Sequence, residues 1–117
     1  MNEKDHTVKQ HFENRVPEVK ATYAAILKEA KKFGPVKEEA KKTSIHLVRK
    51  SAFAGVATRK TALILTLKSD CDISSARIAR REQASANRWH LETRLETPAQ
   101  VDHEIVSWLR KAYDLAS

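Results

Sequence analysis

The segment Ala62-Leu63-Ile64-Leu65-Thr66-Leu67 is the strongest β-strand signal in the sequence. It is short and rich in aliphatic side chains, and polar residues bound it on both sides, which is typical of a strand. Because the run is almost continuously apolar, we expect a central strand that is covered on more than one side. The remaining segments are placed around this strand.

Apolar and polar residues alternate in several neighbouring segments, and this period of two predicts further strands. Four segments share the pattern: 36–40, 44–49, 53–57 and 89–95. Gly55 is expected to mark a bulge or a close approach of the backbone. Residues 68–75 are predicted to form a polar loop, and residues 78–82 fit a strand or a helix equally well.

Two helices are predicted to flank the strand region. The first covers 17–33, starts with a proline in its first turn and ends at Gly34-Pro35. The second covers 98–114, follows the capping box Thr97-Pro98-Ala99-Gln100 and carries its apolar side chains on one face. A further capping box, Thr7-Val8-Lys9-Gln10, predicts a short helix before the first long one.

This order of elements predicts a two-layer α+β domain. We expect an antiparallel or mixed sheet of about five strands, with the N- and C-terminal helices packed on one face. The length of 117 residues favours a single domain over 1–117, with residues 1–6 disordered. The predicted core includes Tyr23, Ile26, Leu27, Leu63, Leu65, Leu91, Leu95, Ile105, Trp108 and Leu109.

Composition indicates a cytoplasmic protein that does not enter a membrane. No apolar run approaches the roughly 18 residues that a membrane-spanning helix needs. The N-terminus, Met1 to His6, lacks the apolar core of a signal peptide. The single cysteine, Cys71, has no partner for an internal disulfide, which favours a reducing compartment.

The positive charge is concentrated in the middle of the chain. Residues 41–94 hold 12 basic and four acidic side chains, a net charge of +8, whereas the other residues hold 10 basic and 11 acidic ones, a net charge of −1. Charge gathered in this way creates a directed field that attracts anions. We therefore predict that the face of the sheet left open by the helices, or its rim, is basic.

The leading functional hypothesis is a non-enzymatic binding module whose basic sheet face meets a polyanion. The partner would be a nucleic acid or an acidic protein, and arginine is favoured for bidentate contacts to phosphate. The alternative is a charged surface that serves only solubility. The residues expected to bind the partner are Arg59, Lys60, Arg77, Arg80, Arg81, Arg88, His90 and Arg94.

Two neighbouring residues in this region allow two interpretations each. His90 either contacts an anion or is a histidine on the solvated face of the sheet bonded to a neighbour such as Glu92. Trp89 either stacks on a nucleic-acid base or belongs to the core.

The sequence lacks the motifs of the common catalytic and cofactor sites. Cys71 lies between Asp70 and Asp72, whose charges disfavour a reactive thiolate. The five histidines include no zinc-binding pair on one helix face, and Gly34 and Gly55 are too few to form a phosphate-binding glycine loop. We therefore predict no catalytic residue, no metal site and no cofactor.

Two alternative functions remain open. A metal-dependent, nuclease-like enzyme would use Glu39-Ala40-Lys41 together with His90, and this hypothesis requires one pocket that joins these residues. The other alternative is a small interaction domain that forms homo-oligomers.

A continuous set of motifs connects the strand region to the second helix. It comprises Phe53-Ala54-Gly55-Val56, Arg59-Lys60, Leu63 to Leu67, Arg77-Ile78, Arg88-Trp89-His90, Arg94-Leu95, Asp102 and Trp108-Leu109-Arg110-Lys111-Ala112-Tyr113. Together these residues resemble the bacterial domain-of-unknown-function family 5655. The resemblance extends from about Thr7 to Leu115. Because that family has no established activity, the resemblance implies no catalytic residues.

Overall fold

The central strand expected from the sequence is β4 (Leu63–Ser69), which lies between β3 (Ala52–Thr58) and β6 (Arg88–Leu95). The expected cover on more than one side was wrong, because β4 buries only alternate residues, which face the helices. The computed structural model describes residues 7–117, so the expectation of disorder over 1–6 lies outside the described residues. The sheet has the order β1-β2-β3-β4-β6-β5, and every neighbouring pair is antiparallel. The α+β class is confirmed, and the sheet has six strands where about five were expected.

The sixth strand comes from the segment that fitted a strand or a helix equally well. The strands are β1 (Lys37–Ala40), β2 (Ile45–Val48), β3 (Ala52–Thr58), β4 (Leu63–Ser69), β5 (Arg80–Ser85) and β6 (Arg88–Leu95). Lys68 and Ser69 belong to β4, because they pair with His90 and Trp89 of β6. The predicted loop at 68–75 was therefore wrong at its start.

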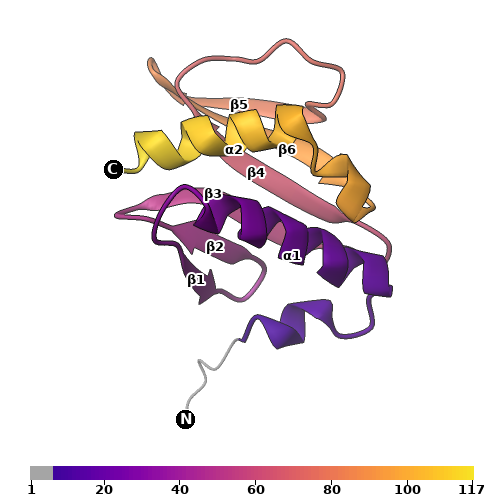
Figure 1. Cartoon of the computed structure of the whole chain (residues 1–117). Coiled ribbons are helices and arrows are strands. Elements are labelled where there is room, and N and C mark those ends of the chain that lie inside the picture. Colours follow the sequence, from indigo (N-terminus) through magenta and orange to yellow (C-terminus); the bar gives the residue numbers. More distant parts are fainter. Residues whose placement is uncertain (1–6) are drawn as a thin grey trace.

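Both helices pack on one face of the sheet and form the second layer (Figure 1). They are α1 (Pro17–Lys31) and α2 (His103–Leu115), with the short 3-10 helices η1 (Lys9–Phe12) and η2 (Pro98–Gln100) ahead of them. The Thr7 and Gln10 box is present at the start of η1, where the Gln10 N–H donates to the Thr7 hydroxyl at 3.2 Å. The N- and C-terminal helices thus pack on one face of the sheet (Figure 1), as expected.

The second helix starts later than the sequence predicted. The capping box of Thr97 and Gln100 is present, but it opens only η2. Val101 then leaves helical geometry, with φ −82° and ψ 74°, and Asp102 caps a new helix by accepting the Ile105 N–H at 3.2 Å. A single helix over 98–114 was therefore wrong, because two competing caps divide the segment.

The core fills the space between the sheet and the two helices. Side chains alternate across each strand, and β4 buries Leu63, Leu65 and Leu67. Every predicted core residue is buried except Leu27, which is partly buried against the same cluster. Outside the prediction, the core also takes in Val19, Ala30, Ile45, Leu47, Phe53, Val56, Leu67, Ala112 and Tyr113.

The irregularity in β3 lies at Phe53 and not at Gly55. The register shifts opposite Leu47 and Val48, so Phe53 is the additional residue and its ring packs edge-on to Tyr113 at 5.2 Å between centroids. Gly55 pairs regularly with His46 and with a β4 residue. The bulge therefore turns Phe53 into the core and leaves Gly55 in regular strand geometry.

Candidate functional site

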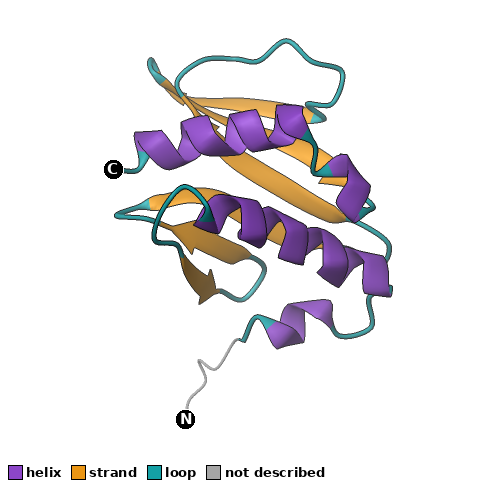
Figure 2. Cartoon of the chain, viewed as in Figure 1, coloured by secondary structure: helices purple, strands orange, loops and turns teal. Residues whose placement is uncertain are grey.

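The two helices cover one face of the sheet (Figure 2), and the opposite face is here called the open face. Directly paired residues of antiparallel strands project to the same side. One row across β2, β3, β4, β6 and β5 therefore consists of His46, Gly55, Thr66, Glu92 and Arg80. A neighbouring row consists of Lys68, His90 and Glu82.

A hollow of about 300 Å³ lies on the open face around Gly55. It is lined by Ser44, His46, Ala52, Phe53, Ala54, Gly55, Ala57, Thr66, Lys68 and His90. A Cβ atom placed on Gly55 would find only His46 Cδ2 within 4 Å, at 3.8 Å. The hollow therefore exists because Gly55 has no side chain and because Ala52 and Ala57, which share its face of β3, have small ones.

Two imidazole rings and one ammonium group line this hollow. Lys68 Nζ donates to Ser51 Oγ at 3.3 Å, which keeps the ammonium group at the sheet surface. His90 Nδ1 lies 3.8 Å from Glu82 Oε1 across the β5–β6 pair. The partner of His90 is thus Glu82, whereas Glu92 was the neighbour expected from the sequence.

Three arginines complete the positive charge of the open face. Arg80 pairs directly with Glu92, and Arg88 and Arg94 share the side of β6 that carries His90. Arg94 Nη2 lies 3.4 Å from Glu96 Oε2, with both side chains about half exposed. An exposed pair of this kind holds its charges weakly, so the Arg94 guanidinium group stays available to a partner.

Arg59 and Lys60 lie beyond the end of the open face, in the turn between β3 and β4. The Arg59 N–H donates to the Ala62 carbonyl at 2.7 Å, and Arg59 Nη1 donates to the Thr58 carbonyl at 3.2 Å. Both side chains are exposed. They belong to the rim of the sheet and not to the hollow.

Arg81 is separated from the other predicted binding residues. Arg81 pairs with Leu91, whose side chain is buried under the helices, so Arg81 projects to the helix side of the edge strand. Its Nε donates to Asp72 Oδ1 at 2.8 Å. The adjacent residues Arg80 and Arg81 therefore lie on opposite faces of the sheet.

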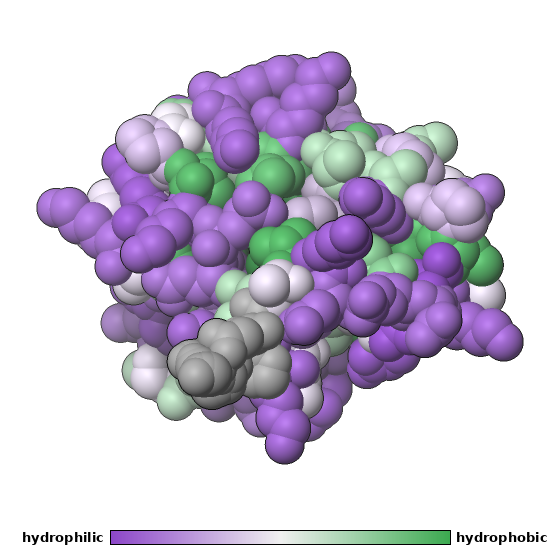
Figure 3. Space-filling model, turned by 90° about the horizontal axis from the view of Figure 1, so that it is seen from below, coloured by the Kyte–Doolittle hydropathy of each residue, from purple (hydrophilic) through white to green (hydrophobic). Residues whose placement is uncertain are grey.

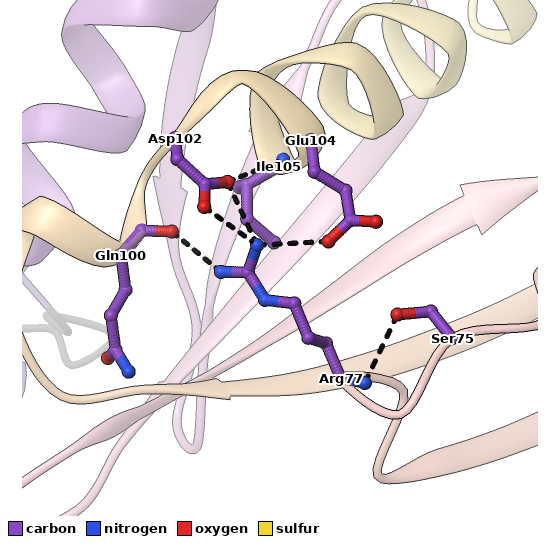
Figure 4. A network of polar contacts seen from close by, with 6 residues as sticks. All are labelled: Ser75, Arg77, Gln100, Asp102, Glu104 and Ile105. Atoms are coloured by element: carbon purple, nitrogen blue, oxygen red, sulfur yellow. Dashed lines mark hydrogen bonds and ion pairs between the residues drawn. The ribbon is translucent and has the colours of Figure 1, made fainter.

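Arg77 is a structural clamp between the β4–β5 connection and α2 (Figure 4). Its Nη1 donates to both carboxylate oxygens of Asp102, at 2.9 and 3.0 Å, and to Glu104 Oε1 at 3.1 Å. Its Nη2 donates to the Gln100 carbonyl at 2.7 Å. With two carboxylates around it, Arg77 has little positive potential left for a polyanion.

The same contacts shift the pKa values of this cluster. The hydrogen bond from Arg77 and that from the Ile105 N–H hold the pKa of Asp102 below its usual range. Burial alone would lower the pKa of Arg77, but the hydrogen bonds to Asp102 and Glu104 outweigh it and raise that pKa. Both groups stay charged at neutral pH, which preserves the clamp.

The residues of the nuclease-like alternative do not share a pocket. Glu39 is on β1 and forms ion pairs with Lys37 and Lys41, at 3.7 and 3.4 Å. Three strands separate β1 from β6, which carries His90. At about 4.8 Å per strand this places Glu39 roughly 19 Å from His90, and the hollow includes His90 alone of these residues.

The remaining candidates for chemistry occupy separate places. Trp89 pairs with Ser69 and packs against the core, as the second of its two interpretations required. Cys71 is exposed in the connection after β4. Within residues 7–117, no three His, Cys, Asp or Glu side chains gather closely enough to hold a metal ion.

No helix in the described part of the chain has the length and apolar character needed to cross a membrane.

His46, Thr66 and Lys68 were not among the predicted site residues. Their proximity depends on the register between β2, β3 and β4, which brings His46 and Thr66 to either side of Gly55. The signal available in the sequence was a glycine within an apolar strand, which can mark a place where another molecule approaches the backbone.

Comparison with known proteins gives a match to a family model that covers most of the sequence. No curated protein and no solved structure matches the chain. The family model described as Domain of unknown function (DUF5655) matches residues 8–116, from the first turn before η1 to the end of α2. This chain therefore belongs to the DUF5655 family.

Proposed function

We propose that this protein is a binding module that holds single-stranded nucleic acid on the open face of its sheet. The observation that carries the proposal is the hollow at Gly55, with His46 and His90 on its lining and Lys68 beside them. Proteins recognise unpaired bases by stacking them on aromatic rings, histidine included. Cationic side chains around the stacked base then contact the phosphates.

The arrangement of charges around the hollow suits such a ligand. Arg88 and Arg94 follow the same side of β6 as His90, and Arg80 stands next to them on β5. Residues two apart on a strand are separated by about 7 Å, so the cations are spread along the face. Glu82 and Glu92 lie between them and limit the net charge, which favours modest affinity.

Fluorescence anisotropy with a labelled single-stranded 12-mer, measured from low to moderate salt, tests the proposal. Binding should weaken as salt rises, because phosphate contacts release counterions. Lys68→Met and Arg94→Gln should each lower the salt dependence by about one released ion. His46→Ala should weaken binding by about 1–3 kcal/mol, the range for one lost stacking contact.

Arg110→Gln is the matched control, since Arg110 is an exposed arginine of α2 paired with Asp114 at 3.4 Å. It should leave binding unchanged. The proposal is overturned if no binding occurs at low salt, or if the control weakens binding as much as the open-face variants. Displacement of the oligonucleotide by polyglutamate at equal charge concentration would also overturn it, because polyglutamate offers no base to stack.

A further inference from the structure

A second polar pocket, of about 420 Å³, lies at the end of the sheet next to η1. This η1 pocket is lined by Gln10, His11, Arg15, Lys42, Thr43 and Thr58. These residues come from η1, from the segment before α1, from the β1–β2 turn and from the end of β3. None of them belongs to the open-face hollow, so the η1 pocket is independent of the proposed function.

The lining residues have the chemistry of an anion site. Arg15 and Lys42 supply a guanidinium and an ammonium group, and Thr43 supplies a hydroxyl. Among the described residues that line the pocket there is no carboxylate. The surface on this side, seen from below in Figure 3, is mostly hydrophilic outside the grey atoms. A pocket of this composition attracts anions and not cations or apolar groups.

Arg15 is held in place before any ligand arrives. Its Nε donates to Thr58 Oγ1 at 3.1 Å, and the Thr58 hydroxyl donates to the His11 carbonyl at 2.6 Å. Thr58 is only 8% exposed, so this anchor is buried. Arg15 Nη1 donates to the Glu13 carbonyl at 3.4 Å, and Arg15 Nη2 has no hydrogen-bond partner among residues 7–117.

The backbone around Arg15 is fixed as well. Asn14 adopts a φ of 60°, in the left-handed region that non-glycine residues enter rarely. The Val16 N–H then donates to the Lys60 carbonyl at 3.0 Å, and His11 Nε2 lies 2.8 Å from the Lys41 carbonyl. The first contact fastens the start of α1 to the β3–β4 turn, and the second joins η1 to the β1–β2 turn that carries Lys42. The pocket is thus preorganised, which reduces the entropy lost on binding.

We infer that the η1 pocket binds the phosphate group of a small phosphorylated molecule. A phosphate monoester presents several oxygens to a guanidinium group, an ammonium group and a hydroxyl at once. The volume exceeds that of one phosphate group and leaves room for the organic part of the ligand.

Titrations followed by NMR amide shifts test this inference with sodium phosphate, methyl phosphate and, at equal ionic strength, sodium chloride. Both phosphates should give saturable shifts at His11, Arg15 and Thr43, with methyl phosphate binding at least as tightly as inorganic phosphate. Chloride should produce no saturable shift at these positions. Arg15→Gln should weaken binding by about tenfold, the expected loss for a charge-assisted contact.

Lys42→Met is the second variant, because Lys42 lies in an exposed turn and its loss leaves the bond between Arg15 and Thr58 intact. It should weaken binding severalfold, so a folding defect in Arg15→Gln would not decide the result. Lys31→Met, on α1, is the control and should have no effect. Three outcomes would each overturn the inference. They are equal phosphate binding by Lys42→Met and the unaltered protein, a saturable shift with chloride, and binding of inorganic phosphate without binding of methyl phosphate.

Discussion

Arg77 and Asp102 lie 25 residues apart in the sequence and are joined by two hydrogen bonds from one guanidinium nitrogen, at 2.9 and 3.0 Å. The same carboxylate caps α2 by accepting the Ile105 N–H. One aspartate therefore starts the second helix and also fastens the β4–β5 connection to it. The connection needs this fastening because it leads into an edge strand whose side chains are all exposed.

Replacing Arg77 with methionine should lower the free energy of unfolding by about 1–2 kcal/mol, because the hydrogen bonds to Asp102, Glu104 and the Gln100 carbonyl are lost. Urea denaturation measures the change. Arg81→Met is the matched control, since the exposed pair of Arg81 and Asp72 should contribute at most about 1 kcal/mol. An equal loss in the two variants would contradict the assignment of Arg77 as a clamp.

The contribution of this clamp should depend on pH. Because the pKa of Asp102 is lower in the folded state, the unfolded chain binds a proton more readily. The stabilisation is complete above the pKa of an unperturbed aspartate and is lost as pH falls through the folded-state pKa. The difference in urea midpoint between the unaltered protein and Arg77→Met should therefore narrow as pH falls below about 5, and the part that remains belongs to the pH-independent bond to the Gln100 carbonyl. A constant difference across this range would exclude Asp102 as the titrating partner.

Gly55→Ala should separate binding from stability. The nearest atom to an added Cβ is His46 Cδ2 at 3.8 Å, an ordinary contact. Reduced freedom of the unfolded chain should then raise stability by about 0.4–1 kcal/mol. The methyl group also occupies the floor of the hollow, so oligonucleotide affinity should fall. A thermal melt with an anisotropy titration checks both effects, and unchanged affinity would show that the hollow takes no base.

Gly34→Ala should have the opposite effect on stability. Gly34 has a φ of 153°, within the region that favours glycine, and an added Cβ would collide with the Tyr113 hydroxyl. That hydroxyl donates to the Pro35 carbonyl at 3.0 Å, so it has little freedom to withdraw. We expect a loss of about 1–3 kcal/mol in the free energy of unfolding, measured by urea denaturation. A neutral result would mean that Tyr113 reorients without cost.

The parts of the fold with a strong apolar period could be predicted from the sequence. The alternating Leu63 and Leu65 predict β4. Apolar residues at helical spacing, such as Ile26 and Ile105, predict α1 and the apolar face of α2. β5 could not be identified with certainty, because Arg80–Ser85 has no buried position and is a strand only through its pairing with β6. The residues of β5 alone therefore do not show that the segment is a strand, because this depends on its pairing with β6.

The candidate site was less accessible to sequence reasoning. The excess of basic side chains in residues 41–94 identified the region of the candidate site. The sequence did not show on which face of the sheet each arginine of that region lies. Arg80 and Arg81 lie on opposite faces because successive side chains of a strand alternate, and the register of β5 against β6 decides which of them takes the open face. The hollow required His46 and Thr66 to pair with Gly55, and a shift of one residue in either register would have placed them on the helix side.

The strand order also determines how long the loops are that must close as the chain folds. Four of the five strand pairs join consecutive strands, so each closes a short loop; only β4 and β6 pair across an intervening strand. Helix α1, by contrast, packs against η2 and α2, which lie near the opposite terminus. Because a long loop must close before α1 reaches η2 and α2, we expect α1 to gain these contacts late in folding. Pulsed hydrogen exchange during refolding should accordingly show the amides of α1 protected after those of β3 and β4.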